Sequence, residues 1–377
     1  MGRGKLGIIS DTAVTFTQDG EWRGYEPVVK EIEYFLKYWD EIEWMAYEFP
    51  ASKTIYSGSL PKTVHVKAVS PLGGASFFSK LKIVGQYVRL FFKVYKLINA
   101  ADEIHVRAPA HPAVCAMLLA PLFPQKNYWF KYAGSWVDAA PKSYEFQRKL
   151  LRRISKGNIY TTVNGNWVDS NSNIIAFENP CFSASVYDLS TRQSELTKEP
   201  NRELRLVYVG SLSEFKGVHL VIEALERINF KGISSFTIIG TGEFQSSLAK
   251  FAEASPYKER FIFKGKQTKE EVFKILEVSD LLIIASTTEG FPKVISEAMM
   301  NYCVPISTRV SCIDQYINDE IGFMIDERSV DGIAQTLKKA TSDPNLSKKK
   351  QNARALAARF TYENYLTHLF QTVFKNK

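Results

Sequence analysis

Two glutamates, Glu289 and Glu297, follow the apolar segment Leu281–Ala285, which is typical of a buried strand. Gly290 lets backbone amides approach a ligand closely, and a helix starting near Val294 would direct its free N–H groups at an anion. Glu297 would then lie in the first helical turn, where its two oxygens can accept hydrogen bonds from adjacent hydroxyls, such as those of a ribose. The pattern indicates a sugar and phosphate site, although a loop carboxylate and a helix-capping carboxylate without a ligand would look the same.

Backbone amides and one lysine complete the expected anion site. Pro292 cannot donate, so the available amides are those of Gly290, Phe291, Lys293 and Val294. An earlier loop, residues 210–217 (GSLSEFKG), has Gly210 and Gly217 at its ends and leads from a predicted strand into a predicted helix. Lys216 at that helix entry, with the amides around Gly217, could neutralise a diphosphate. The alternative is an exposed lysine in an ordinary turn.

Two further turns end neighbouring predicted strands. Gly240-Thr241-Gly242 follows one of them, and Lys264-Gly265-Lys266-Gln267 follows the next. A Gly-x-Gly turn is weak evidence by itself, since many strand-to-helix connections contain one. The four turns nevertheless fall at the carboxyl ends of strands in one sheet, where ligands of such folds bind. We therefore add Gly240, Gly242 and Lys266 to the expected sugar and phosphate site.

The alternation of short apolar runs with longer amphipathic ones predicts an α/β protein with two parallel sheets. The first layer ends with a helical stretch expected at Trp167–Ser172, and a second, more regular layer begins at Leu204. The polar stretch Ser190–Asn201 between them is typical of a linker. We expect domains at residues 1–198 and 199–355, and a C-terminal helix at residues 356–377 that packs on the first domain.

The second half resembles the donor domain of the retaining family-4 glycosyltransferases, which have the GT-B architecture of two facing Rossmann-like, doubly wound domains with a cleft between them. The resemblance rests on the 210–217 loop, the Gly240 and Gly265 turns, and the two glutamates separated by seven residues. It implies that Lys216 contacts the donor diphosphate and that Glu289 orients the transferred sugar, which makes these two the catalytic candidates. Glu297 would hold the ribose. The family commonly has Arg where this chain has Ser211, and we place Ser211 in the donor site with Gly210 and Gly217.

The first half departs further from the family. Family members often have a glycine-rich loop after the first strand, and the candidates for it in this chain are Gly20 and Gly24, of which Gly24 lies just before the helix expected at Pro27. Many members also have a histidine near the donor sugar. This chain has the segment 131–136 (KYAGSW) there, where Lys131 or Ser135 could take its place. Arg107 ends another predicted strand and could reach a phosphate or the acceptor. His105 is expected to be a core or surface residue, not a catalytic one.

Charge is distributed unevenly along the chain, whose formal net charge is +8. Residues 51–101 contain lysines and arginine but no acidic residue, and residues 77–99 interleave these cations with aromatic and aliphatic side chains. Such a helix could lie on anionic lipid headgroups, while a core helix with a solvated lysine face is the alternative. No nucleic-acid-binding motif accompanies the charge. The four cysteines lack the spacing of metal ligands. Neither an export signal nor a membrane-spanning segment is expected, so we expect a cytoplasmic protein. It would be peripheral on the inner membrane face if residues 77–99 bind lipid.

These observations predict a retaining glycosyltransferase, of hexosyltransferase type, that uses a nucleotide-diphosphate sugar as co-substrate and a glycan or lipid-linked hydroxyl as acceptor, in surface polysaccharide or glycoconjugate synthesis. No Asp-x-Asp lies at a strand end of the predicted cleft, so we expect neither a metal nor another cofactor. One alternative is a sugar-nucleotide epimerase of the same architecture, which would convert the nucleotide sugar without an acceptor. Another is a non-catalytic subunit that binds the nucleotide sugar and scaffolds a partner.

Overall fold

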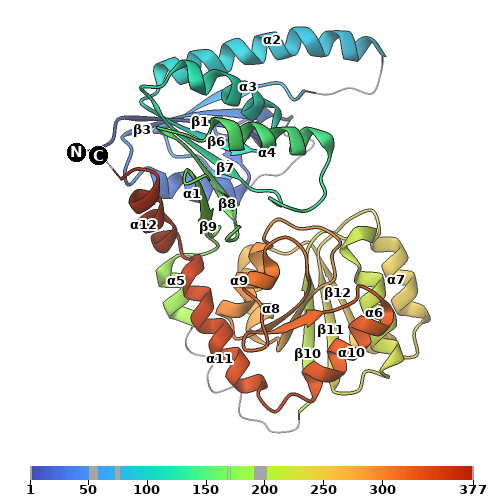
Figure 1. Ribbon diagram of the computed structural model, residues 1–377. Coiled ribbons are helices and arrows are strands. Elements are labelled where there is room, and N and C mark those ends of the chain that lie inside the picture. Colours follow the sequence, from blue (N-terminus) through green and yellow to red (C-terminus); the bar gives the residue numbers. More distant parts are fainter. Residues whose placement is uncertain are drawn as a thin grey trace. The chain divides into compact units, whose positions relative to one another are not determined.

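The computed structural model describes residues 2–50, 58–72, 77–167, 169, 171–190 and 202–375 (Figure 1). The chain forms two compact units. Unit 1 comprises Met1–Phe177 and Leu366–Lys377, and unit 2 comprises Glu178–Tyr365. The domain boundary expected at residue 198 lies in the stretch 191–201, outside the described residues.

Unit 1 contains a sheet in which seven strands run parallel in the order β5-β3-β1-β6-β7-β8-β9. Two short strands, β2 and β4, add antiparallel pairing beyond the carboxyl half of β1. The chain order reverses between β1 and β6, and this switch point is where ligands of doubly wound sheets bind. The strands are β1 (Lys5–Phe16), β2 (Trp22–Gly24), β3 (Glu41–Glu48), β4 (Gly58–Ser59), β5 (Val64–Val69), β6 (Glu103–Ala108), β7 (Asn127–Tyr132), β8 (Ile159–Asn164) and β9 (Ile174–Phe177).

Helices lie on both faces of this sheet, with α2 and α3 on one side and α1 on the other (Figure 1). Large aromatic side chains fill the core, since Trp44, Trp129 and Phe130 are fully buried. The second half of α12 joins unit 1, because Phe370 stacks on Trp39 with ring centroids 5.7 Å apart. The helices are α1 (Glu26–Phe35), α2 (Phe77–Ala100), α3 (His111–Leu119), α4 (Lys142–Ile154) and α12 (Tyr362–Thr372).

Unit 2 has a six-stranded parallel sheet in the order β12-β11-β10-β13-β14-β15, which is the Rossmann order with its switch point between β10 and β13. Helices α6, α7 and α10 lie on one side of it, and α8 and α9 on the other (Figure 1). The strands are β10 (Leu204–Val209), β11 (Ile233–Ile239), β12 (Phe261–Gly265), β13 (Leu281–Ile284), β14 (Val304–Thr308) and β15 (Phe323–Ile325). The helices are α5 (Ala184–Leu189), α6 (Val218–Arg227), α7 (Gln245–Ala254), α8 (Lys269–Glu277), α9 (Lys293–Met300), α10 (Val330–Thr341) and α11 (Leu346–Ala357).

The predicted α/β fold with two parallel sheets is confirmed, but the helix expected at Trp167–Ser172 is wrong. Among the described residues there, side chains bond to the backbone and compete with helical pairing. Trp167 donates its indole N–H to the Asn164 carbonyl, and the Asn171 amide donates to the Arg152 and Ser155 carbonyls. The described residues Trp167, Asp169 and Asn171 are not helical, and a turn at residues 172–173 leads into β9, a strand that the sequence pattern did not predict.

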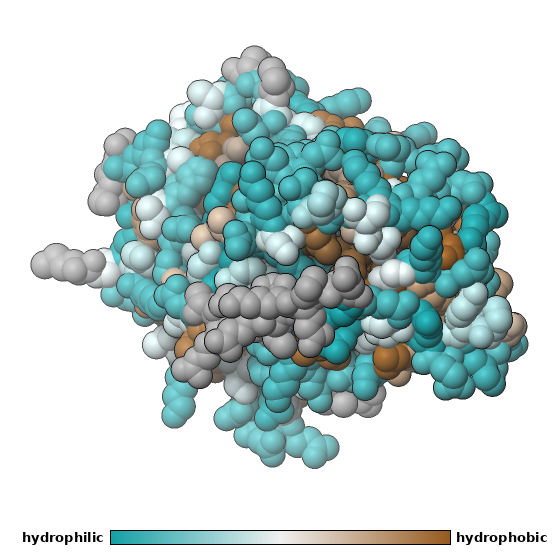
Figure 2. All heavy atoms as spheres, turned by 90° about the horizontal axis from the view of Figure 1, so that it is seen from below, coloured by the Kyte–Doolittle hydropathy of each residue, from teal (hydrophilic) through white to brown (hydrophobic). Residues whose placement is uncertain are grey.

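Hydrophilic residues predominate on the face shown in Figure 2, where hydrophobic residues form small, separate patches. Among the described residues, no helix is long and apolar enough to cross a membrane. Apolar side chains instead form one core in each unit, as expected for two doubly wound layers.

Candidate functional site

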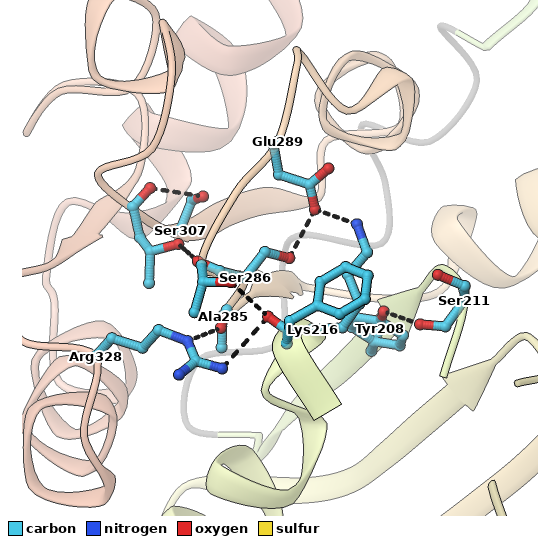
Figure 3. Close-up of polar contacts among 11 residues, drawn as sticks. Tyr208, Ser211, Lys216, Ala285, Ser286, Glu289, Ser307 and Arg328 are labelled. Atoms are coloured by element: carbon cyan, nitrogen blue, oxygen red, sulfur yellow. Dashed lines mark hydrogen bonds and ion pairs between the residues drawn. The ribbon is translucent and has the colours of Figure 1, made fainter. Parts of the chain in front are cut away.

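Lys216 and Glu289 meet at the switch point of unit 2 (Figure 3). Lys216 lies in the loop after β10, and Glu289 lies in the loop after β13, which is the neighbouring strand. The Lys216 ammonium donates to a Glu289 carboxylate oxygen at 2.5 Å, and both side chains are largely buried. The two catalytic candidates of the sequence therefore form a single ion pair at the edge of the sheet where ligands bind.

Hydroxyl and guanidinium groups hold the loops around this pair (Figure 3). Ser286 donates its hydroxyl to the same Glu289 oxygen at 2.6 Å, which fixes the carboxylate from a second direction. Arg328 donates to the Ala285 carbonyl at 2.7 Å and to the Phe215 carbonyl at 3.3 Å, so it ties the two loops together. The sequence analysis did not single out Ser286 or Arg328. The signal for Arg328 was a cation shortly after β15, at the same sheet edge.

The predicted glycines Gly210, Gly240 and Gly242 bring two neighbouring loops into backbone contact. A Cβ on Gly240 would lie 1.8 Å from the Gly210 carbonyl oxygen, and one on Gly242 would lie 2.2 Å from the Leu212 carbonyl oxygen. Gly240 also has φ +134°, which side chains of L-residues rarely adopt. The close approach of these loops explains the glycines without any ligand, and the Gly210, Leu212 and Gly240 amides there donate to backbone carbonyls.

We expect Gly240→Ala to lower the free energy of unfolding of unit 2 by about 3 kcal/mol or more, through backbone strain and steric overlap. Gly265→Ala is the matched control, because Gly265 has φ +64° but nothing lies within 4 Å of its added Cβ. That variant carries the backbone strain alone and should cost about 1–2 kcal/mol. Urea denaturation followed by circular dichroism measures both, and equal losses would contradict the steric explanation.

The loop between β13 and α9, residues 285–292, carries Glu289 and is called the donor loop here. Helix α9 begins at Lys293, one residue before the predicted start. Glu297 is its fifth residue and lies in the second turn, so the prediction that it lies in the first turn is wrong. The helix dipole therefore acts on Glu297 more weakly than expected. The amides of Lys293 and Val294 do lie in the first turn, where helical N–H groups have no partner within the helix.

Phe291 anchors the donor loop from below. It is 7% exposed and stacks on Phe360, with ring centroids 5.0 Å apart and an angle of 3° between the ring planes. Tyr316 meets the same Phe291 ring edge-on at 5.0 Å. Aromatic pairs of this geometry fix the position of the backbone that carries them. The loop between Glu289 and α9 is thus held by residues far away in the sequence.

Glu297 is surrounded by protein and by two lysines. Lys269 lies 3.9 Å from its carboxylate and also donates to the Cys181 carbonyl at 2.8 Å. Burial raises the pKa of Glu297, and the charges of Lys269 and Lys293 oppose that change. The ionised carboxylate is therefore costly in the unliganded protein, and hydrogen bonds from a ligand would offset part of that cost.

We expect Glu297→Gln to raise the melting temperature above that of wild type, and to do so more at neutral than at acidic pH. The same change should weaken nucleotide binding. Because the pKa of Glu297 is raised on folding, wild type loses stability as the pH rises from the unfolded value, near 4.5, through the folded value. Glutamine removes that loss, so the difference between variant and wild-type melting temperatures should increase across this pH window. Glu277→Gln, on the exposed end of α8, is the control. A difference that does not change with pH would contradict the assignment.

Ser211 and Lys266 are two further predicted donor residues. Ser211 is exposed, and its backbone carbonyl accepts a hydrogen bond from the Tyr208 hydroxyl at 2.8 Å (Figure 3). Lys266 is exposed after β12, which β11 and β10 separate from the switch point. Strands lie about 4.8 Å apart, so Lys266 starts roughly 10 Å to the side of the β10 loop.

In unit 1, one buried carboxylate joins two of the predicted residues. Glu31 of α1 is 1% exposed and accepts from Arg107 at 2.8 Å and from Lys131 at 2.7 Å. Arg107 and Lys131 lie opposite each other on β6 and β7. Arg107 was predicted to reach a phosphate or the acceptor, and Lys131 to take the place of the family histidine. Glu31, whose charge opposes theirs, was not predicted from the sequence.

Gly24 and Ser135 have local structural roles. Gly24 is a buried residue of β2, and a Cβ there would lie 3.0 Å from Val29 and 3.2 Å from the ring of Trp44. Ser135 donates its hydroxyl to Asp138 at 2.9 Å and accepts from the Asp138 N–H at 3.1 Å. Both contacts account for these residues without a ligand.

His105 is a core residue, as predicted. It is fully buried and stacks on Trp129 with ring centroids 3.9 Å apart. Burial lowers the pKa of His105 to about 3, although the charge of Glu31 acts in the opposite direction. The imidazole is therefore neutral at physiological pH. In the part of the chain that the structure describes, no three His, Cys, Asp or Glu side chains are grouped so that they could hold a metal ion.

Comparison with known proteins identifies the second unit. Residues 190–357 match the family model described as glycosyl transferases group 1. WcaL of Escherichia coli strain K12, named as a colanic acid biosynthesis glycosyltransferase, is 27% identical over 158 residues, which cover 40% of this chain and only 39% of WcaL. The N-acetyl-alpha-D-glucosaminyl L-malate synthase of Bacillus anthracis is 25% identical over 70% of this chain and 71% of its own.

Solved structures match the whole chain at low identity. A glycosyltransferase from Rickettsia africae ESF-5 gives a TM-score of 0.67 at 16% identity and covers both chains fully. Anabaena Alr3699/HepE, solved in complex with UDP and glucose, gives a TM-score of 0.67 at 14% identity over 99% of each chain. Such likeness at low identity establishes the fold. Residues 190–357 therefore match the family model of the glycosyl transferases group 1, and the chain has the fold of the GT-B glycosyltransferases.

Proposed function

We propose that this protein is a retaining glycosyltransferase that moves a sugar, most simply a hexose, from a nucleotide-diphosphate sugar to a hydroxyl of a glycan or lipid-linked acceptor. The observation that carries the proposal is the Lys216–Glu289 ion pair at the switch point of a group 1 domain. One cation and one carboxylate meet there, in the loops that precede α6 and α9. A diphosphate and a sugar polyol would each find a complementary group.

In the proposed reaction, the Lys216 ammonium and the first-turn amides of α9 take up the negative charge that develops on the leaving diphosphate. Such preorganised charge stabilises the transition state without a protein nucleophile. The Glu289 carboxylate, already held by Ser286, accepts hydrogen bonds from the donor sugar and fixes its orientation. The bond from the anomeric carbon to the diphosphate oxygen breaks, the acceptor oxygen bonds to that carbon from the same face, and the acceptor proton passes to the departing phosphate oxygen. We propose that these groups act without a divalent metal or other cofactor.

A panel of nucleotide sugars tests the donor half of the proposal. A donor that binds the folded protein specifically should raise its melting temperature, and UDP-glucose belongs on the panel because a structural neighbour was solved with UDP and glucose. Donors that bind are then incubated alone and with an acceptor pool from bacterial envelopes. We expect a sugar transfer that requires acceptor and persists in EDTA. Conversion of the nucleotide sugar without an acceptor would indicate an epimerase instead of a transferase. Binding of the nucleotide sugar without any transfer would indicate a non-catalytic scaffold.

We further propose that the protein acts in surface polysaccharide or glycoconjugate synthesis, in the cytoplasm and peripheral on the inner membrane face. Helix α2 supports the membrane part. Its residues Val88, Phe92 and Tyr95 are 52%, 59% and 42% exposed and lie along one stripe, at intervals of four and three residues. Exposed cations flank the stripe, namely Arg89, Lys93 and Lys96. An apolar stripe with a basic rim fits the boundary between headgroups and acyl chains of anionic lipid.

We expect Phe92→Ser to reduce binding to vesicles that contain phosphatidylglycerol about threefold or more, because Phe92 is 59% exposed and its ring is available for insertion. Phe251→Ser on α7 is the matched control, since Phe251 is 46% exposed on a helix of unit 2. Co-sedimentation measures both. Equal binding of all three proteins, or equal binding to neutral and anionic vesicles, would contradict the lipid assignment.

A further inference from the structure

Arg328 lies in the connection between β15 and α10, at the same edge of the unit 2 sheet as the donor loop. The backbone on both sides of it is closely held. The Ser329 hydroxyl accepts from the Gly332 N–H at 3.1 Å and caps α10, and a Cβ on Gly332 would lie 2.1 Å from the Glu327 carbonyl oxygen. The Arg328 side chain therefore extends from a fixed base.

Its guanidinium reaches two carbonyls, and each belongs to the peptide bond that leads into a residue of the site (Figure 3). Nε donates to the Ala285 carbonyl at 2.7 Å, and Ala285 directly precedes Ser286. Nη2 donates to the Phe215 carbonyl at 3.3 Å, and Phe215 directly precedes Lys216. One planar group thus holds the backbone next to the ammonium and the backbone next to the hydroxyl that binds Glu289.

The Phe215 carbonyl also accepts from the donor loop. The Thr287 N–H donates to it at 3.0 Å and the Thr287 hydroxyl at 3.5 Å. The Phe215 side chain is 48% exposed, so side-chain packing holds this turn less firmly than a core residue would. Hydrogen bonds to one carbonyl therefore join the 210–217 loop to two other loops, directly before Lys216.

Gly217 leaves the space that Arg328 fills. Its φ is +72°, and a Cβ there would lie 2.3 Å from the Ala285 carbonyl oxygen and 3.1 Å from Nη2 of Arg328. A side chain at position 217 would displace the guanidinium from the carbonyls that it binds. The glycine after Lys216 is thus part of the same arrangement.

The hydrogen-bond partners of Arg328 are neutral. In the part of the chain that the structure describes, no carboxylate lies within ion-pair distance of its guanidinium, and both hydrogen bonds go to backbone carbonyls. Burial lowers the pKa of Arg328, and the charge of Glu214 acts in the opposite direction. A neutral side chain would be easier to bury, but the guanidinium presents several N–H donors in a fixed plane.

We propose that Arg328 is a positioning residue for the transfer reaction. By holding two carbonyls, it fixes the Lys216 ammonium relative to the Glu289 carboxylate, without touching either substrate. This role rests on the transferase function proposed above, because it concerns how that site is kept ready for the transition state.

Kinetics of Arg328→Met and Arg328→Lys test this role, with the nucleotide sugar of the panel that supports transfer. Arg309→Met is the matched control, because Arg309 follows β14 at the same sheet edge and binds the exposed Asp326 at 3.3 Å. We expect Arg328→Met to lower kcat about 10- to 100-fold and to change KM less than about threefold, since the reacting groups are misplaced. Arg328→Lys keeps the charge without the planar fork, so its kcat should fall about fivefold or more. Wild-type kcat in either Arg328 variant would overturn the proposal.

A double variant separates positioning from a general loss of stability. On the Lys216→Ala background, Arg328→Met should lower kcat at most about threefold, because the ammonium that it positions is gone. Full multiplication of the two losses would contradict the role. So would a fall in kcat that only matches a smaller folded fraction, measured by circular dichroism. If Arg328→Met does not fold, Arg328→Lys takes its place in each measurement.

Chemical labelling tests the positioning without any turnover. Trace acetylation with acetic anhydride, read by mass spectrometry, compares the Lys216 amine with the exposed Lys250 of α7. The Lys216 ammonium is largely buried in its ion pair, so we expect this ratio to rise about threefold or more in Arg328→Met and to stay unchanged in Arg309→Met. An unchanged ratio in folded Arg328→Met would overturn the proposal. Failure of the transferase function would show differently, as the expected labelling without turnover of any nucleotide sugar by wild type.

Discussion

Replacing Lys216 by alanine is expected to lower the rate of sugar transfer about 100- to 1,000-fold, the range seen when one preorganised donor to a developing negative charge is removed. Lys216 lies at the switch point with its ammonium 2.5 Å from Glu289. A diphosphate bound at the α9 amides would lie within reach of the same ammonium. The loss should fall mainly on kcat, because charge on the leaving group develops only in the transition state.

Three variants separate this catalytic effect from a folding defect. Glu289→Gln removes the charge of the sugar-orienting group while keeping its size, so it should also impair transfer. Lys250→Ala removes an exposed lysine of α7 and should transfer at the wild-type rate. Circular dichroism and melting temperature establish that Lys216→Ala is folded, since Ser286 still holds Glu289 in that variant. A folded Lys216→Ala protein with undiminished transfer would refute the role of Lys216.

The positions of Lys216, Gly217 and Glu289 in the fold could be predicted because their signals are local. Lys216 and Gly217 lie in the loop after β10, Glu289 lies in the loop after β13, and parallel strands place their carboxyl ends at one edge of a sheet. Chain order alone therefore brings the 210–217 loop beside the Glu289 loop once β10 and β13 are neighbours. Lys266 was grouped with them for the same reason, but β12 is the outer strand of this sheet.

Contacts between distant residues could not be predicted in this way. Glu31 reaches Arg107 and Lys131 across 76 and 100 residues, and nothing around Glu31 in the sequence distinguishes it from a surface glutamate of an amphipathic helix. The register of β1 against β3, which shifts between Ile9 and Ala13, depends on pairing with a strand some 30 residues away. The stacking of Phe291 on Phe360 joins the donor loop to a segment beyond α11. Such pairings are set by tertiary packing, which a single sequence does not encode locally.

The largest effect on stability is expected at Asp280, the residue before β13. Its carboxylate is 2% exposed and accepts from the Lys350 ammonium at 2.6 Å, from the Arg202 guanidinium at 2.7 Å and from the Arg205 N–H at 2.9 Å. Asp280→Ala would leave the largely buried Lys350 ammonium without its carboxylate. Breaking a buried pair in this way costs about 3–5 kcal/mol, and we expect that loss in the free energy of unfolding of unit 2.

A second substitution distinguishes an uncompensated charge from a packing defect. Lys350→Met on the Asp280→Ala background removes the buried cation, so it should recover part of the lost stability even though it deletes another native contact. The chain offers a useful internal reference, because all six tryptophans lie between residues 22 and 167, in unit 1. Tryptophan fluorescence therefore follows unit 1 in urea, whereas far-UV circular dichroism follows both units. Asp280→Ala should shift the circular dichroism transition to lower urea by more than the fluorescence transition. The double variant could instead have a lower free energy of unfolding than Asp280→Ala alone. In that case the carboxylate stabilises the unit through packing and hydrogen bonds to β10, and the uncompensated charge of Lys350 is not the source of the effect.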